Sequence, residues 1–160
     1  MSHPDEDGKG LSLAMRNAIS EARCNIEDIT YINAHGVGTK SMDEIEVKAI
    51  YDVFGDIVKK LSISSIKGAS GALDDIISIL TLLNNKIPPT LNVSAKNLIT
   101  DLNIICDDFK PVDINKVMSN SVAIGGINSS IIFGRNIWLW QMFFQCLLQF
   151  GSWLRMGNTM

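Results

Sequence analysis

The chain has 160 residues, of which 46% are hydrophobic and 19% are charged, and its formal net charge is −3. This length accommodates one domain with a hydrophobic core, and this composition excludes a disordered chain. The negative net charge excludes a globally basic surface of the kind that binds nucleic acid. The N-terminus has neither the basic nor the apolar segment of a secretory signal, so we expect a cytoplasmic protein.

The cysteines give no indication of a metal site. Cys24, Cys106 and Cys146 lie far apart, and no cysteine–histidine spacing typical of zinc ligands occurs. We therefore predict three reduced thiols and no metal.

The first half of the chain alternates helices and strands. Apolar residues at helical spacing predict a helix over residues 12–23, and the β-formers of residues 29–33 predict a strand. Ser41 and Glu44 fit a capping box at the start of a second helix, which we expect to end at Gly55. A second strand is predicted over residues 61–65.

The second half begins with a helix over residues 69–83 that is apolar on most sides, so we expect it to be buried. Short strands are then predicted over residues 102–106, 116–121 and 129–133. Alternating strands and helices followed by a pair of strands indicate an α/β fold with a mostly parallel sheet.

Four short motifs follow one another along this framework. They are Tyr31–Gly36 with Thr39, Asp43 and Glu46 behind it, Ser64–Lys67, Ile87–Asn92, and Ser119–Asn128. In this order and spacing they resemble the β-ketoacyl-acyl carrier protein synthases, the condensing enzymes of fatty acid biosynthesis. The resemblance covers roughly residues 4–135.

The resemblance implies a thiolase-like fold, in which two similar α/β halves pack together, usually within a homodimer. This chain corresponds to the C-terminal half, an incomplete domain over residues 1–135 followed by a separate apolar, aromatic tail over 136–160. The family reaction is an acyl transfer: malonyl-carrier protein loses carbon dioxide and the carbanion attacks an acyl thioester on a cysteine. The implied partner is acyl carrier protein, whose phosphopantetheine-linked acyl group is the substrate, and no cofactor is implied.

Two residues match catalytic positions of the family. His35 matches the first of two histidines that bind the malonyl thioester oxygen, and Lys67 matches a lysine that orders the site through a carboxylate. Asp74 stands where that carboxylate, usually a glutamate, would lie. The second histidine has no counterpart, because Lys67 runs directly into Gly68–Gly71, which matches the residues that follow this histidine in the family. The resemblance therefore implies that these positions are remnants rather than a complete site.

The fourth motif also departs from the family. Ile124 stands where the family has an aromatic gate between the acyl and malonyl pockets. Gly125 and Gly126 are retained, and they fit either the family's turn or an ordinary tight turn between two strands.

The nucleophilic cysteine of the family belongs to its N-terminal half and has no counterpart here. Asp107 and Asp108 follow Cys106 and should raise the pKa of its thiol. The first strand of the C-terminal half, which lies at the centre of its sheet, also has no counterpart. We expect the two strands beside it to be left unpaired, so that the chain is unstable or needs another polypeptide to complete the sheet.

The tail carries no charged residue from Ile137 to Leu154. Gln141, Gln145 and Gln149 recur every four residues, which favours a helix lying on a membrane or partner surface over a span. The alternative is a sequence translated past a lost stop codon.

Three hypotheses for function remain open from the sequence. The chain is a degraded, inactive fragment of a condensing enzyme, or half of a split enzyme completed by a separate N-terminal chain, or a non-catalytic module that binds a membrane or a partner. Acyl chain length, oligomeric state and expression are not determined by the sequence.

Overall fold

The computed structural model describes residues 7–66, 71–94, 98, 100–123 and 126–135. Its main sheet has four strands in the order β2-β1-β5-β6. β1 runs parallel to both of its neighbours, and β6 is antiparallel to β5. The strands of this sheet are β1 (Ile29–Asn33), β2 (Ser62–Ser64), β5 (Lys116–Ala123) and β6 (Ile127–Gly134). The predicted α/β fold with a mostly parallel sheet is confirmed.

The predicted helices are confirmed with shifted ends: α1 (Lys9–Glu21), α2 (Lys40–Phe54) and α3 (Gly71–Asn84). Two 3₁₀ turns, η1 (Ile26–Asp28) and η2 (Gly55–Lys60), and a small antiparallel pair, β3 (Lys86–Ile87) and β4 (Lys110–Pro111), complete the described elements. The predicted capping box at Ser41 is wrong. The N-cap of α2 is Thr39, two residues earlier, and it makes no side-chain capping bond.

The strand predicted over residues 102–106 is also wrong. This segment makes a single parallel bridge between Ile104 and Ile63 on the outer edge of β2. Two backbone hydrogen bonds hold it there: the Ile63 N–H donates to Asn103, and the Ile105 N–H donates to Ile63. The segment therefore covers the edge of β2 without forming a strand of its own.

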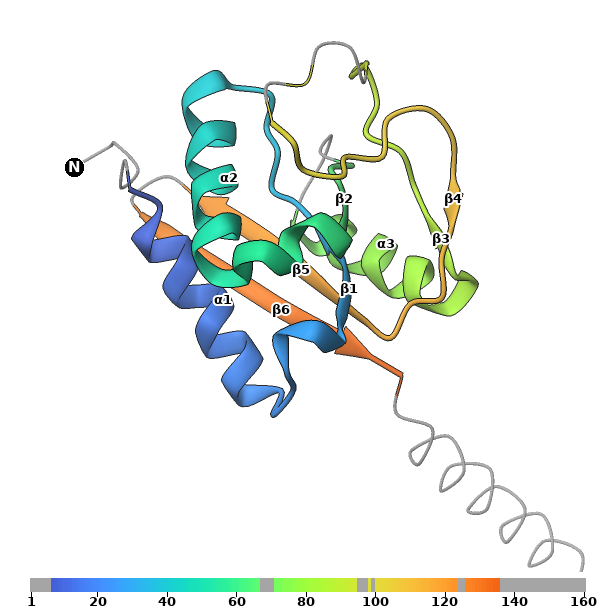
Figure 1. Cartoon of the computed structure of the whole chain (residues 1–160), viewed down its shortest axis with the longest axis horizontal. Coiled ribbons are helices and arrows are strands. Elements are labelled where there is room, and N and C mark those ends of the chain that lie inside the picture. Colours follow the sequence, from blue (N-terminus) through green and yellow to red (C-terminus); the bar gives the residue numbers. More distant parts are fainter. Residues whose placement is uncertain (1–6, 67–70, 95–97, 99, 124–125, 136–160) are drawn as a thin grey trace, which may run out of the picture.

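The two faces of the sheet bury separate hydrophobic clusters. Ile32 and Met118 face α1 and α2 and join the larger cluster, while Tyr31 and Val117 face α3 and join the smaller one. Because successive residues of a strand point to opposite faces, these neighbouring pairs divide between the two layers. In Figure 1, α1 and α2 lie on one side of β5 and β6, and α3 lies beyond β1.

The expectation of unpaired strands at the centre of the sheet is wrong. β1 pairs directly with β5, with Tyr31 opposite Val117 and Ile32 opposite Met118, after one irregularity near Ile29. Parallel strands need a separation of only about 4.8 Å, and each buried backbone group left unpaired costs about 1–3 kcal/mol, so closing the sheet is favoured. The described sheet is therefore continuous without a strand from another polypeptide.

The expectation that α3 is buried on most sides is wrong as well. Its buried residues are Asp74, Ser78, Thr81 and Leu82. Five of its large apolar residues are exposed within the described part of the chain: Leu73, Ile76, Ile79, Leu80 and Leu83. The helix thus turns a largely polar face toward the sheet and an apolar face outward.

Hydrogen exchange tests the closed sheet. We expect the amides of β5 that point toward β1 to exchange as slowly as those that point toward β6, because both sets are hydrogen-bonded within the sheet. Residue-resolved exchange by NMR measures both sets in one sample. Fast exchange confined to the β1-facing amides of β5, with its β6-facing amides protected, would show that the two strands do not pair.

Candidate functional site

The four sequence motifs meet at one end of the sheet. His35 follows the carboxyl end of β1, Ser65 follows β2, and Val122 lies near the end of β5. Thr90, from the third motif, accepts a hydrogen bond of 3.0 Å at its Oγ1 from the Ser65 N–H. The carboxyl ends of parallel strands are where ligands gather in α/β sheets, so this end of the molecule is the candidate site.

The imidazole of His35 is buried, with 7% of the residue exposed. Its Nδ1 atom accepts a hydrogen bond of 3.3 Å from the backbone N–H of Val122. A ring nitrogen that accepts a hydrogen bond carries no proton, so the neutral ring has its proton on Nε2. The backbone of β5 thereby fixes both the orientation of the ring and its tautomer, in which Nε2 carries the proton.

Glu46 of α2 holds the turn that carries this histidine. Its carboxylate accepts the backbone N–H of His35 at Oε1 and that of Gly36 at Oε2, each at 2.9 Å. Asn120 of β5 donates to Oε1 from its side chain at 3.3 Å. Burial raises the pKa of the Glu46 carboxyl, and the three donors oppose that rise because they stabilise the charged form.

Glu46 was noted in the sequence only as part of the first motif and not as a site residue. A signal for its burial was present, because Glu46, Ala49, Ile50 and Val53 lie on one stripe of α2, and all four are buried. A carboxylate on the core stripe of a helix requires donors, and here the donors are the backbone of the turn after β1 and the amide of Asn120.

Gly36 allows the ends of β1 and β2 to approach closely. Its φ is +34°, and a Cβ atom at this position would lie 2.6 Å from the Cβ of Ser65. The Ser65 hydroxyl donates to the Gly36 carbonyl at 3.0 Å. A side chain at position 36 would therefore push the first and second motifs apart.

Asp74 lies in the first turn of α3 and is 4% exposed. Its backbone carbonyl accepts hydrogen bonds from the Asn33 amide at 3.0 Å and the Ser78 hydroxyl at 2.8 Å. Among the described residues, the Oδ1 atom of Asn33 is the one buried side-chain nitrogen or oxygen atom without a hydrogen-bond partner. Asp74 is thus placed beside the end of β1, but Lys67, its predicted partner, lies outside the described residues, and their pairing stays a prediction.

Tyr31 adds a buried polar contact between β1 and β2, on the side of the sheet that faces α3. Its hydroxyl shares a hydrogen bond of 2.9 Å with the Ser64 hydroxyl. Burial, followed by the charge of Asp74, raises the pKa of the Tyr31 phenol far above its usual range, so this group stays protonated.

A cavity of about 110 Å³ opens beside His35. Leu11 of α1, Met42 of α2 and Val122 of β5 contribute to its mostly apolar wall, and Glu46 and Gly126 also line it. It is small beside the roughly 300–1,000 Å³ of typical ligand pockets, so it fits the end of a ligand and not a long acyl chain.

Gly126 has a φ of +79°, as expected of a turn that needs glycine. Ile124 and Gly125 lie outside the described residues, so their predicted roles are untested.

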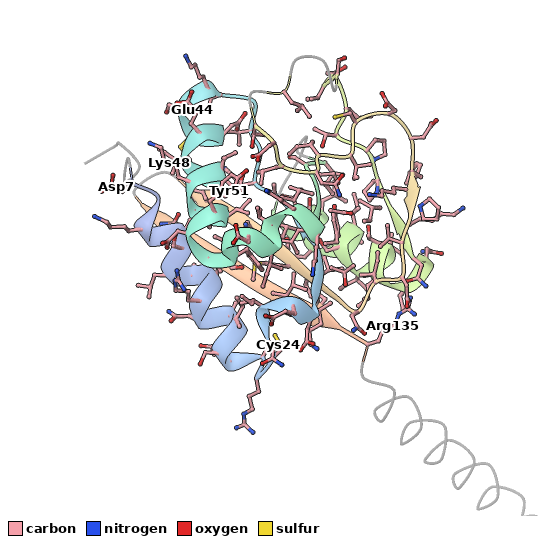
Figure 2. The ribbon with its side chains drawn as sticks, in the orientation of Figure 1. Asp7, Cys24, Glu44, Lys48, Tyr51 and Arg135 are labelled. Carbon is pink, nitrogen blue, oxygen red and sulfur yellow. The ribbon has the colours of Figure 1, made fainter. Side chains whose placement is uncertain are left out.

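Neither described cysteine is activated as a nucleophile. Burial raises the pKa of the Cys24 thiol, and burial together with Asp107 raises that of Cys106, which confirms the direction predicted for Cys106. Figure 2 shows Cys24 at the end of the molecule opposite Glu44, which lies on the first turns of α2 near the site. Cys146 lies outside the described residues. Within those residues, no helix is both long and apolar enough to cross a bilayer.

The family profile of the β-ketoacyl synthase C-terminal domain matches residues 1–94. The chain therefore belongs to the β-ketoacyl synthase family. It is 37% identical over 142 residues to 3-oxoacyl-[acyl-carrier-protein] synthase 2 of Coxiella burnetii, covering 84% of this chain and 34% of that protein. It is also 37% identical over 137 residues to 3-oxoacyl-[acyl-carrier-protein] synthase 2 of Staphylococcus aureus, covering 81% of this chain and 34% of that protein.

The fold comparison agrees with the sequence comparison. A β-ketoacyl synthase structure from Burkholderia phymatum superposes with a TM-score of 0.75 at 34% identity, covering 84% of this chain and 34% of that one. The thiolase-like fold of the ketosynthases is therefore shown, and the chain spans about a third of the length of the relatives it matches.

Exchanging Glu46 for glutamine tests whether its carboxylate stabilises the turn after β1. The Glu46→Gln amide places an NH₂ group against a backbone N–H, so one buried donor loses its acceptor, which costs about 1–3 kcal/mol of stability. Urea denaturation followed by circular dichroism measures this loss. Glu44→Gln, the same exchange two residues earlier on another face of α2, should leave the midpoint unchanged, and equal effects of the two exchanges would refute the assignment.

Proposed function

We propose that this chain is the C-terminal part of a β-ketoacyl-acyl carrier protein synthase of fatty acid biosynthesis, and that His35 binds the carbonyl oxygen of the malonyl thioester. One observation carries the proposal: the Val122 N–H occupies Nδ1 of the imidazole, so the neutral ring presents Nε2–H as a donor. The relatives named above are synthases that work with acyl carrier protein, which supports the same substrate carrier here.

A fixed donor matters because of where charge develops in this reaction. When malonyl-carrier protein loses carbon dioxide, the electron pair of the broken C–C bond moves into an enolate, and the thioester oxygen becomes negative. A pre-positioned N–H close to that oxygen stabilises the developing charge. The enolate carbon then attacks the acyl thioester, forms the new C–C bond and expels the thiolate that held the acyl group.

His35 is suited to this role because its surroundings are fixed before substrate arrives. Glu46 holds the backbone of His35 and Gly36, and β5 holds the ring. Donors that are already oriented need no rearrangement as the charge appears, which is the main source of their effect. The neutral tautomer also donates without giving up its proton to solvent.

These 160 residues are not expected to condense thioesters unaided. The site has one imidazole where the family uses two, and removing one such donor typically costs about 100- to 1,000-fold in rate. Both described thiols have raised pKa values, so neither is a thiolate that could hold the acyl group. The nucleophile would come from the part of the synthase to which this chain does not correspond, and a homodimer is the expected assembly by resemblance.

Nitrogen-15 NMR of the histidine rings tests the tautomer. In the neutral pH range, the ring of His35 should show a protonated Nε2 and an unprotonated Nδ1. The chain has two histidines, and a His35→Asn variant assigns the signals by removing one of them. A ring protonated at Nδ1 would contradict the contact with Val122 and remove the donor from the proposed role.

An assay with malonyl- and acyl-carrier protein tests the catalytic statement. The chain alone should release no carbon dioxide and form no β-ketoacyl product, whereas the Coxiella burnetii relative should do both under the same conditions. Condensation by this chain alone would overturn the proposal that its nucleophile comes from another part of the synthase.

The same assay separates an inactive fragment from half of a split enzyme. The N-terminal two thirds of the Coxiella burnetii relative is added to this chain or to its His35→Asn variant. Condensation that appears only with the unchanged chain supports the split enzyme. No activity in either mixture supports an inactive fragment.

A further inference from the structure

A side-chain contact between β5 and β6 continues the hydrogen-bond network of Glu46. The Ser130 hydroxyl on β6 donates to Oδ1 of Asn120 on β5 at 3.0 Å. The two residues stand directly opposite each other in the strand register, where Cβ atoms lie about 4.5–5.5 Å apart, so the register brings their side chains together. Both side chains share a face of the sheet with Met118 and Ile132, because residues two apart along a strand point the same way. The contact therefore lies on the side of the sheet that α1 and α2 cover (Figure 1).

Asn120 has a partner at each end of its side-chain amide. Its Nδ2 donates to Oε1 of Glu46 at 3.3 Å and, more weakly, to Sδ of Met15 at 3.6 Å, while its Oδ1 accepts from Ser130. Only 1% of Asn120 is exposed, so an amide atom that lost its partner here would find little water to replace it. Because both ends are bound, the plane of the amide has one orientation, and Nδ2 is directed at the carboxylate.

The hydroxyl of Ser130 affects the strength of this donor as well as its direction. A hydrogen bond to the oxygen of an amide polarises the group, so its N–H becomes a stronger donor. Burial raises the pKa of the Glu46 carboxyl, and the Asn120 amide is one of the donors that oppose this rise. A weaker donor would leave the carboxyl more easily protonated. A protonated carboxyl is a poorer acceptor for the backbone N–H groups of His35 and Gly36, since one of its oxygens then carries a proton.

The charged and titratable groups around Glu46 do not substitute for this donor. The charge of Asp43, on the same helix, raises the pKa of the Glu46 carboxyl. The turn after β1 contributes backbone N–H groups, and the ring of His35 is neutral in the tautomer that accepts from β5. The contacts of this network from β5 and α1 are the uncharged side chains of Asn120 and Met15. The carboxylate therefore depends on neutral donors, and Asn120 is the one whose orientation a further side chain fixes.

We propose that Ser130 is a positioning residue of the site, which through Asn120 keeps the Glu46 carboxylate bound to the turn after β1. It touches neither the imidazole nor a reacting atom, and it acts through two other side chains. The inference rests on the proposed function only for the role of His35, because the hydrogen bonds from Ser130 to the turn are present without substrate.

Carbon-13 NMR of the glutamate carboxyl groups in the full-length chain tests the proposal, because it follows the titration of Glu46 with no substrate present. In a Ser130→Ala variant, the apparent pKa of Glu46 should move to a higher value. The backbone amides of His35 and Gly36 should exchange about fivefold faster, because their acceptor is weaker. A Glu46→Gln variant assigns the carboxyl signal by removing it, and circular dichroism confirms that Ser130→Ala remains folded.

Ser129→Ala is the matched control for this exchange. Ser129 is the neighbouring residue on β6, it is exposed, and it stands opposite Ser121, so its side chain lies on the other face of the sheet. This variant should leave the pKa of Glu46 and the amide exchange as in the unchanged chain. Ser130→Thr retains the hydroxyl and should also leave both measurements unchanged, which distinguishes the hydrogen bond from a loss of packing.

An unchanged pKa of Glu46 in Ser130→Ala, or an equal change in Ser129→Ala, would overturn the proposal. A change in Ser130→Thr as large as that in Ser130→Ala would overturn it too, because the effect would then not follow the hydroxyl. Both measurements are made on the chain alone, so their outcome is independent of whether the assays with carrier protein detect condensation.

Discussion

The arrangement of the site depends on one buried carboxylate. Glu46 accepts the backbone N–H groups of His35 and Gly36 and the side-chain amide of Asn120, so a single side chain joins α2, the turn after β1, and β5. Because the carboxylate has lost its contact with water, each of these donors is needed to offset the cost of burial. The position of His35 is therefore set by the packing of α2 as much as by the turn that contains it.

The other contacts of the site extend the same network. Val122 fixes the histidine ring, Ser65 binds the carbonyl of Gly36, and Thr90 binds the backbone of Ser65. Four segments that are distant in the sequence thus converge at the carboxyl ends of β1, β2 and β5. The result is one oriented imidazole beside a small apolar cavity, and the proposed binding of the malonyl thioester oxygen depends on this arrangement. The thiolate that would hold the acyl group is not among the described residues.

The two sides of the sheet differ in how they are stabilised. The side of α1 and α2 is a conventional hydrophobic core that includes Ile32, Phe54 and Met118. The side of α3 combines a smaller apolar cluster with buried polar contacts from Tyr31 and Asn33. This difference explains why α3 can place serine and threonine against a sheet while five of its leucines and isoleucines face outward.

The sequence by itself determined the α/β class, the limits of most helices and strands, the four motifs, and His35 as a candidate site residue. These features follow from local patterns: apolar spacing, β-branched runs, glycines at turns, and motif order. The sequence did not determine that β1 and β5 pair directly, that α3 is polar inside and apolar outside, or that Glu46 binds the turn after β1. Only the tertiary structure decided these points, because strand partners, the buried side of a largely apolar helix and the donors to a carboxylate depend on residues far apart in the chain.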